Sequence, residues 1–364
     1  MKLSEKSCAH IDACRFCWMC RHICPIGNAT GQERNTSRAR ALSLSLVNRE
    51  GADFSDDVVD NVYECALCGA CTKECVTGWD PVLFTKEARL KAALEGKTPT
   101  YVSRLLDCVF ETGNIYGKTE TDGMLTDAIR SLGNSKTLLY LGADARYLTP
   151  EISLRAIELL RLAKVDFTVL EQEPDSGFAL DFLIGAAEET RAAVLNTAAA
   201  LSEYETVICL DPQDMKMFIR EYKEWNAGLT AEIVSFPACL LRLIQSGALK
   251  PAPSALTAVF QDPALLAREV GETEPEREVL RACLFLSEML LNRKDTMLAG
   301  HSIMDTYMPQ VMDQVAARRW HEALECGVQA LITASPAEYA VMGRNKPEQM
   351  QLLSLEEAVL AACK

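Results

Sequence analysis

Two cysteine-rich runs near the start of the chain limit its fold and chemistry more than any other feature. Each run has four cysteines at the spacing C-x2-C-x2-C-x3-C. They are Cys14, Cys17, Cys20 and Cys24 in the first run, and Cys65, Cys68, Cys71 and Cys75 in the second. Nine of the fifteen cysteines lie within the first 75 residues, and an odd total is untypical of a disulfide scaffold. The runs therefore predict metal sites in a reducing compartment.

The spacing also indicates which metal centre is bound. Three thiolates two residues apart can surround three iron corners of a cubic cluster, and the fourth iron takes its ligand from elsewhere. The first run, with Pro25 after it, is similar to the run of bacterial two-cluster ferredoxins, whereas Val76 replaces the proline after the second. In those ferredoxins the fourth cysteine of each run binds the other cluster.

This resemblance implies two [4Fe–4S] clusters with crossed ligation. Cluster 1 is assigned to Cys14, Cys17, Cys20 and Cys75. Cluster 2 is assigned to Cys65, Cys68, Cys71 and Cys24. Crossed ligation holds the two clusters near one another, which suits electron transfer. No catalytic residue and no cofactor beyond the clusters is assigned.

Structural zinc is the main alternative metal, because two tetrahedral zinc sites would also use eight cysteines. Zinc sites usually combine two C-x2-C pairs, so the repeated triple spacing favours iron–sulfur clusters. Cys8 fits no ligand spacing, and the six cysteines after Cys75 are expected to be small buried side chains.

Charge and hydropathy narrow the class of protein further. The formal net charge of −14 excludes a typical nucleic-acid binder and argues against docking on an anionic membrane. The first ten residues are polar, and no stretch has the roughly 18 uninterrupted apolar residues of a membrane-spanning helix. We therefore expect a cytoplasmic protein that is at most peripheral to a membrane.

The chain divides into segments with different patterns of predicted secondary structure, and the predicted fold class is α plus α/β. The sequence predicts helices at 38–47, from Asp56 onward and at 81–94, and strands at 137–141, 166–170, 206–210, 256–260 and 328–333. The predicted parts are a helical two-cluster ferredoxin-like domain at 1–96, a linker at 97–135, and α/β units at 136–250 and 251–364.

The two α/β units look like a duplication. Residues 206–214 align with residues 330–338, since in both a hydrophobic strand is followed by a proline and a polar turn. Strands that alternate with helices predict mainly parallel sheets with helices on their faces.

The whole arrangement resembles the heterodisulfide-reductase-related iron–sulfur proteins. These include iron–sulfur subunits of anaerobic glycerol-3-phosphate dehydrogenase and of glycolate and lactate oxidases, typical of anaerobic metabolism. Members join a helical two-cluster domain to two cysteine-rich repeats called CCG domains. Besides the cysteine runs, the resemblance is carried by 113–117, 262–268 and 274–280.

The repeats have lost the cysteines that the resemblance implies. In the first unit the motif positions hold Gly142-Ala143, Asp175-Ser176-Gly177 and Asp211-Pro212-Gln213-Asp214. In the second they hold Gln261-Asp262-Pro263-Ala264, Leu298-Ala299-Gly300 and Ser335-Pro336-Ala337-Glu338. These residues supply no thiolate for the catalytic cluster of heterodisulfide reductases. We expect their carboxylates to be solvated on exposed turns, and Asp211→Ala and Glu338→Ala to leave activity of the parent complex unchanged.

The first hypothesis for function is an electron-transfer subunit of an oxidoreductase complex. The resemblance implies a partner that is a flavoprotein dehydrogenase or electron-transfer flavoprotein, together with a further electron carrier. No G-x-G-x-x-G fingerprint for a flavin or nicotinamide is present in this chain. The alternatives are a subunit that itself reduces a heterodisulfide or a quinone, and a scaffold or redox sensor.

Overall fold

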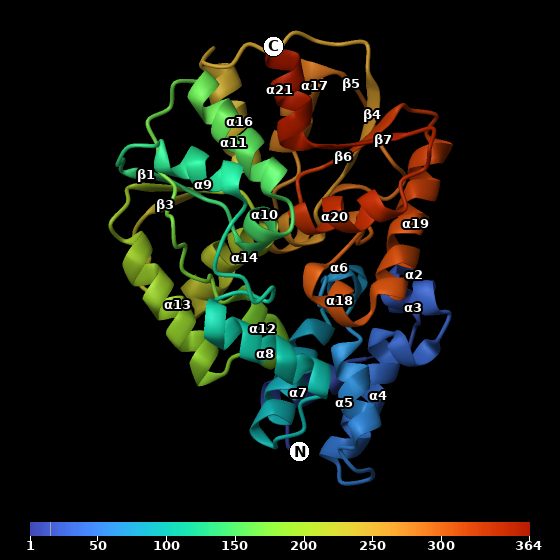
Figure 1. The fold of residues 1–364 in the computed structure, drawn as a ribbon. Helices are drawn as coiled ribbons and strands as arrows, with labels where there is room; N and C mark the ends of the chain where they lie inside the picture. Colours follow the sequence, from blue (N-terminus) through green and yellow to red (C-terminus); the bar gives the residue numbers. More distant parts are fainter. Residues whose placement is uncertain (15) are drawn as a thin grey trace.

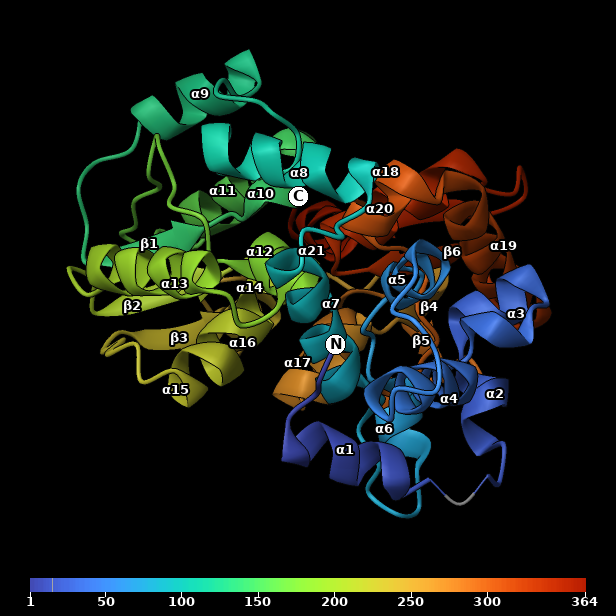
Figure 2. The ribbon, with the colours of Figure 1, turned by 90° about the horizontal axis from the view of Figure 1, so that it is seen from below.

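The computed structural model describes residues 1–14 and 16–364. Figure 1 shows three parts that follow the sequence: a helical part in blue and cyan, a first α/β unit in green and yellow, and a second in orange and red. In Figure 2 the two sheets lie on opposite sides, and the first helices lie beside the second unit. This agrees with the packing of α3 (Pro25–Thr30) on α19 (Pro309–Glu325). The predicted α plus α/β class is confirmed.

In its described residues, the first part contains seven α-helices that surround the cysteine runs. They are α1 (Glu5–Asp12), α2 (Met19–Ile23), α3 (Pro25–Thr30), α4 (Ser37–Asn48), α5 (Asp56–Tyr63), α6 (Ala70–Glu74) and α7 (Pro81–Leu94). The start of α7 shows why the helix forms there, since the Asp80 side chain accepts from the N–H groups of Val82 and Leu83, and Pro81 occupies the first helical position. The helices predicted at 38–47, from Asp56 and at 81–94 are confirmed.

The segment predicted as a linker, 97–135, contains two packed helices. These are α8 (Thr100–Thr112) and α9 (Gly123–Arg130). Their apolar residues recur every three or four positions, and those of α8 that are buried are Val102, Leu105 and Val109. Such a stripe packs against neighbouring helices, here α12 (Phe178–Ile184) for α8 and α11 (Pro150–Leu162) for α9. The segment is therefore part of the folded core, whereas the predicted domain boundaries themselves stay predictions.

The first α/β unit has a parallel sheet with the strand order β1-β2-β3. The strands are β1 (Thr137–Tyr140), β2 (Thr206–Cys209) and β3 (Glu232–Ser235). The helices are α10 (Ala143–Tyr147), α11 (Pro150–Leu162), α12 (Phe178–Ile184), α13 (Glu188–Leu201), α14 (Pro212–Lys216), α15 (Tyr222–Glu224) and α16 (Phe236–Gln245). A π-helical segment, Met217–Glu221, joins α14 to α15. The strand predicted at 166–170 is only a bridge from Thr168 to Leu138.

The second unit has a parallel sheet with the order β5-β4-β6-β7. The strands are β4 (Thr257–Gln261), β5 (Phe285–Ser287), β6 (Ala330–Thr333) and β7 (Gln351–Ser354). The helices are α17 (Pro275–Cys283), α18 (Ser302–Tyr307), α19 (Pro309–Glu325), α20 (Pro336–Arg344) and α21 (Leu355–Cys363), with a π-helical segment at Leu266–Val270.

The predicted duplication agrees with the order of the strands. The core β1-β2-β3 of the first sheet corresponds to β4-β6-β7 of the second. In both units the middle strand leads into a helix with proline in its first turn, Pro212 or Pro336. In both units the last strand ends at a serine, Ser235 or Ser354, whose hydroxyl caps the following helix.

The three parts share their hydrophobic cores. One cluster of buried residues runs from the helices around the cysteine runs into both units, and a second cluster joins β1 and β2 to β4 and β6. Contacts between α7 and α12 place the second cysteine run against the first unit. In the part of the chain that the structure describes, no helix combines the length and apolar character needed to cross a membrane.

Candidate metal centre

The two cysteine runs adopt the same backbone conformation. The residue two positions after the first cysteine has a positive φ in both, 53° at Phe16 and 50° at Leu67. The residue after the second cysteine does too, 68° at Trp18 and 72° at Gly69. These left-handed residues curl each loop before a short helix, α2 or α6, begins. A repeated strained loop of this kind is typical of a shared ligand geometry.

The structure gathers four cysteines of the two runs around one cavity. Cys24, Cys65, Cys68 and Cys71 line it. Burial raises the pKa of the Cys24 thiol to about 12. Burial, followed by the nearby thiols of Cys65, Cys68 and Cys24, also raises the pKa of Cys71. Because their pKa values are raised, such thiols stay protonated near neutral pH unless a bound metal centre replaces the protons. These four are the residues that the crossed pattern assigns to cluster 2.

The other four cysteines include the most exposed one of the two runs. Cys17 is exposed, and Cys14, Cys20 and Cys75 are half-buried. Cys14 and Cys17 lie close enough to Cys20 to influence its titration. The Cys75 loop reaches the same place, because Thr77 Oγ1 lies 3.2 Å from Cys75 Sγ and donates to the carbonyl of Ala13 at 3.5 Å. Arg15 within this loop lies outside the described residues. These contacts bring the two loops together, and the ligand set of cluster 1 stays a prediction.

The environments of the two sets differ in exposure. Beside the cluster 1 cysteines, Phe16 is 52% exposed and Val76 is 87% exposed. Beside the cluster 2 cysteines, Ala66, Leu67 and Ala70 are all buried. The buried Ser37 hydroxyl lies between the sets, since it lowers the pKa of both Cys20 and Cys71 against the larger effect of burial. The cluster 1 set thus contains the exposed Cys17 and has exposed neighbours, whereas the cluster 2 set contains the buried Cys68 and has buried neighbours.

Three arginines surround the cluster 2 cysteines. Arg40 lines the cavity and donates to the carbonyls of Asn61 and Asn35, at 2.9 and 3.2 Å. Arg89 donates to the carbonyl of Cys65 at 2.5 Å, and Arg268 to that of Cys68 at 2.8 Å. Among the described residues, none of the three has a carboxylate partner within 4.0 Å. Buried cations require a compensating anion, and a cluster with four thiolates fits this need.

Replacing Arg40 tests whether its positive charge is compensated by a bound cluster. Arg40→Gln keeps a hydrogen-bond donor but removes the positive charge, so adding an electron to cluster 2 becomes less favourable. We expect its midpoint potential to fall by about 50 mV or more, the equivalent of roughly 1 kcal/mol for one electron. Redox titration followed by electron paramagnetic resonance checks this. Arg34→Gln is the matched control, because Arg34 already pairs with Asp57 and Glu64. Equal shifts in both variants would contradict a specific role of Arg40.

The carboxyl groups in the altered repeat motifs are buried, so the expectation that they are solvated on exposed turns is wrong. Asp211 and Glu338 are each 2% exposed, and Asp214 is 6% exposed. The turns that carry them lie at the carboxyl ends of β2 and β6, where the two units pack on other parts of the chain. Sequence alone does not show this, because the segments that cover these turns come from distant positions.

In the first unit the three altered motif segments meet. Ser176 and Asp214 form a hydrogen bond, and Gln213 donates to Asp144. A Cβ atom on Gly142 would lie 2.2 Å from Asp214 Oδ2, so only glycine fits there. Burial raises the pKa of both Asp211 and Asp214 well above the usual range. Across the described residues, no group of three or more His, Cys, Asp or Glu has the arrangement of a single metal-ion site.

The second unit fills its altered site with a different network. Glu338 accepts from Thr333 Oγ1 at 3.0 Å and from Gln261 Nε2 at 3.2 Å. Arg319 in turn donates to Gln261 Oε1 at 2.7 Å. Burial raises the pKa of Glu338 to about 8. Hydrogen-bonded polar side chains therefore stand at positions where the resemblance implies cysteines. One of them, Ser335, caps α20 by accepting a hydrogen bond from the N–H of Glu338.

Glu338 makes the stability of the protein depend on pH. Its folded-state pKa lies above the value of about 4.3 expected for an unfolded chain. The stabilisation from its protonated form is complete below pH 4 and is lost as the pH rises through about 8. In the unchanged protein, the free energy of unfolding should fall with rising pH in this window, with a slope approaching about 1.4 kcal/mol per pH unit. We expect Glu338→Gln to remove this dependence on pH. Urea unfolding between pH 5 and 8 measures it, and Glu348→Gln at an exposed position should show no such change.

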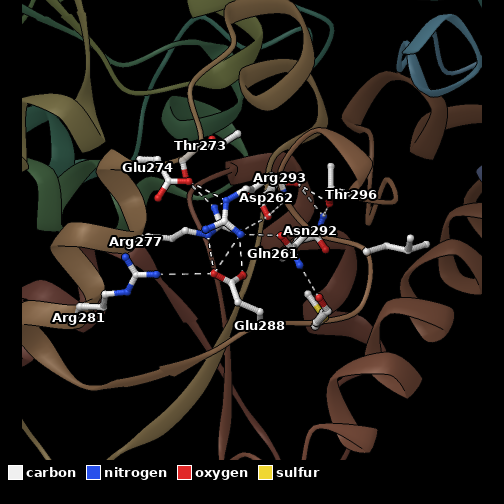
Figure 3. A network of polar contacts seen from close by, with 12 residues as sticks. Gln261, Asp262, Thr273, Glu274, Arg277, Arg281, Glu288, Asn292, Arg293 and Thr296 are labelled. Atoms are coloured by element: carbon white, nitrogen blue, oxygen red, sulfur yellow. Dashed lines mark hydrogen bonds and ion pairs between the residues drawn. The ribbon is translucent and has the colours of Figure 1, made fainter. Parts of the chain in front are cut away.

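Beside this network, a buried arginine holds the second unit together (Figure 3). Arg277 of α17 forms two hydrogen bonds with Asp262 at the end of β4, at 2.6 and 2.8 Å. It also donates twice to Glu288, at 2.7 and 2.9 Å. The N–H of Arg293 adds a bond to Asp262 at 2.7 Å. Two of the segments that carry the family resemblance, 262–268 and 274–280, thus meet at one ion pair.

Comparison with known proteins supports the assignment of the cysteine runs. Residues 10–79 match the family described as the 4Fe-4S dicluster domain, which covers all eight cysteines. Over 317 residues the chain is 30% identical to a probable membrane-anchored ferredoxin of Chromohalobacter salexigens, covering 74% of this chain and 47% of that protein. Over 271 residues it is 24% identical to the probable iron-sulfur-binding oxidoreductase FadF of Bacillus subtilis, covering 66% and 37%.

The chain spans less than half the length of these two relatives. Among solved structures, it is similar to a hypothetical protein from Helicobacter pylori with a TM-score of 0.50 and 11% identity, covering 99% of this chain and 73% of that one. That likeness concerns the fold alone. The domain match and the two relatives confirm the predicted relationship to iron–sulfur proteins of oxidoreductase systems.

Proposed function

We propose that this iron–sulfur protein is an electron-transfer subunit of an oxidoreductase complex. Two [4Fe–4S] clusters with the crossed ligand sets would relay electrons between a flavoprotein partner and a second carrier. The observation that carries the proposal is the pairing of two four-cysteine sets on either side of Ser37, one with the exposed Cys17 and the other around one cavity with the buried Cys68. When bound, such clusters supply one-electron chemistry.

The chain's own residues prepare each site differently. The arginines Arg40, Arg89 and Arg268 place positive charge near the inner set. This charge would stabilise the reduced, more negative form of a cluster bound there. Buried Ala66, Leu67 and Ala70 lie beside that set, whereas the exposed Phe16 and Val76 lie beside the other. Net charge and solvent exposure both tune cluster potentials, so the two sites should differ in potential.

The outer set is also where a partner would dock. Phe16, Trp18 and Met19 are exposed beside it, and the Arg38 guanidinium stacks over Trp18 at 3.7 Å. Exposed aromatic and arginine side chains are enriched in protein interfaces. A flavoprotein dehydrogenase or electron-transfer flavoprotein is the proposed partner, because no dinucleotide fingerprint occurs in this chain and a relative is named as an oxidoreductase.

Anaerobic purification of the chain tests the proposal. Iron, acid-labile sulfide and the paramagnetic spectrum after reduction are measured. About eight irons with two interacting cubane spectra supports the relay. A third distinct spectrum would mean that the altered repeats still hold a catalytic cluster, and zinc without sulfide would overturn the proposal. A flavoprotein dehydrogenase or electron-transfer flavoprotein from the same organism, reduced by its own substrate, should then reduce the clusters.

A further inference from the structure

The residues around the first cysteine run carry the opposite charge to the chain as a whole. Residues 13–49 contain six arginines, no lysine and one acidic residue, Glu33, although the whole chain has a formal net charge of −14. Arginine, unlike lysine, stacks on aromatic rings and binds a carboxylate through two parallel hydrogen bonds. Arg40 lies inside, beside the cluster 2 cysteines. The cluster ligands do not account for the others.

Two of these arginines stack on the aromatic side chains of the first cysteine loop. The Cζ atoms of Arg38 and Arg21 lie 3.7 and 5.9 Å from the centroid of the Trp18 ring. Arg38 Cζ also lies 4.9 Å from the Phe16 ring centroid. Cations over aromatic faces attract one another, so the stack holds its members in place before any partner arrives. We call Phe16, Trp18, Arg21 and Arg38 the docking platform.

The docking platform is open to solvent beside a predicted cluster ligand. Phe16 is 52% exposed and Trp18 is 36% exposed, and Arg21 is exposed as well. The residue between the two rings is Cys17, which is also exposed and is assigned to cluster 1. A protein that covers the platform therefore lies directly against the cysteine through which electrons would leave or enter.

The exposed surface continues along α4. Leu42 and Leu46 follow Arg38 at intervals of four residues, which places the three on one face of that helix. Leu42 is 41% exposed and Leu46 is 55% exposed. Figure 2 shows α4 beside α2, the helix of Arg21, and the two helices pack together. Exposed apolar side chains next to aromatic and arginine residues are typical of a protein interface.

The charges of the docking platform select an acidic partner. Arg38 lies 3.4 Å from Glu33, whereas Arg21 has no carboxylate within 4.0 Å in the part of the chain that the structure describes. Helix α4 has no acidic residue at all. A carboxylate-rich face meets attraction here and repulsion over most of the remaining surface, which fixes where it docks. An anionic lipid surface is disfavoured, because the chain as a whole is strongly negative.

We propose that the docking platform binds the acidic face of a flavoprotein. Arg21 would pair with a carboxylate of that partner, and Trp18 would be covered at the centre of the contact, where aromatic residues contribute most to binding. The inference deepens the proposed function and rests on it, since the partner is the flavoprotein of the proposed relay.

The test is calorimetric titration of the anaerobically purified full chain with oxidised flavodoxin, a small acidic flavoprotein. We expect one site per chain, with an affinity that falls as sodium chloride is added. Arg21→Glu should weaken binding about tenfold or more, because attraction becomes repulsion. Trp18→Asn should do the same, since asparagine tolerates the left-handed backbone at this position. Arg104→Glu, at an exposed position of α8, is the matched control and should leave binding unchanged.

A second pair of variants lies outside both cysteine runs, so that cluster loss cannot mimic loss of docking. Leu42→Glu should weaken binding about tenfold or more, whereas Met124→Glu, at a 69% exposed position of α9, should not. Absence of binding to the unchanged chain, or equal weakening by the control variants, overturns the proposal. So does sedimentation with phosphatidylglycerol vesicles that Arg21→Glu abolishes, because the platform would then be a lipid-binding surface.

Iron analysis of the same samples separates this proposal from the relay. Calorimetry with an oxidised partner does not depend on electron flow. Fully loaded clusters without flavodoxin binding would reject the acidic partner and leave the relay intact. Missing iron and sulfide would instead reject the relay itself.

Discussion

Replacing Cys24 with alanine is expected to remove the cluster of the second cysteine run and to spare that of its own run. Cys24 lines the cavity formed by Cys65, Cys68 and Cys71, and the thiols of Cys68 and Cys65 lie close enough to help raise its pKa. Iron should fall from about eight to about four per chain, since each cluster holds four irons. The remaining paramagnetic spectrum should match that of Cys68→Ala and differ from that of Cys17→Ala.

The reciprocal variant completes this experiment. Cys75→Ala should lose the same spectrum as Cys17→Ala, because the Cys75 loop reaches Ala13 at the start of the first run. Cys8→Ala is the control, since Cys8 lies in the same part of the chain but contacts Asn48 and the carbonyl of Leu3. It should keep all the iron. If Cys24→Ala instead matched Cys17→Ala, each run would bind its own cluster and the crossed assignment would fail.

Removing the Arg277 side chain should be the most destabilising single change in the second unit. Arg277 and Asp262 are both buried, at 0% and 1% exposure, so Arg277→Leu leaves a carboxylate without its partner. Breaking a buried pair in this way typically costs about 3–5 kcal/mol. Urea unfolding followed by circular dichroism measures the change, and the iron content shows whether the cysteine runs stay folded.

Two controls separate the ion pair from a general effect of mutation on α17. Arg281→Leu removes an arginine of the same helix that is 53% exposed and 4.0 Å from Glu288, and should cost less than about 1 kcal/mol. The double variant Asp262→Leu with Arg277→Leu should lose clearly less than the sum of the single variants. Strict additivity would show that the pair is not coupled.

Local patterns allowed much of the fold to be predicted from the sequence. The helix at 81–94 has a capping aspartate and a proline at its start, and β2 and β6 are short apolar runs before a proline. The spacing of the cysteines predicted the domain that the family match covers. In each case the residues that determine the element lie next to one another in the chain.

Features that depend on distant contacts were missed or misjudged. β3 begins with an exposed glutamate and β5 has only three residues, so neither has a clear strand pattern. Asp211 and Glu338 are on turns that sequence reasoning places at the surface, but segments from elsewhere in the fold cover them. His301 had no motif partner, and its place near Leu67, more than 200 residues earlier, is visible only in three dimensions.

The unequal exposure of the two cysteine sets also bears on handling in air. Oxygen reaches an open site before one enclosed by side chains, so the set that contains the exposed Cys17 should lose iron first. A briefly aerated sample would then hold about half its iron and show one cubane spectrum. It would resemble a protein built for a single cluster, although the second set of ligands is merely damaged. Cluster counts for this chain are therefore meaningful only when oxygen has been excluded from lysis onward.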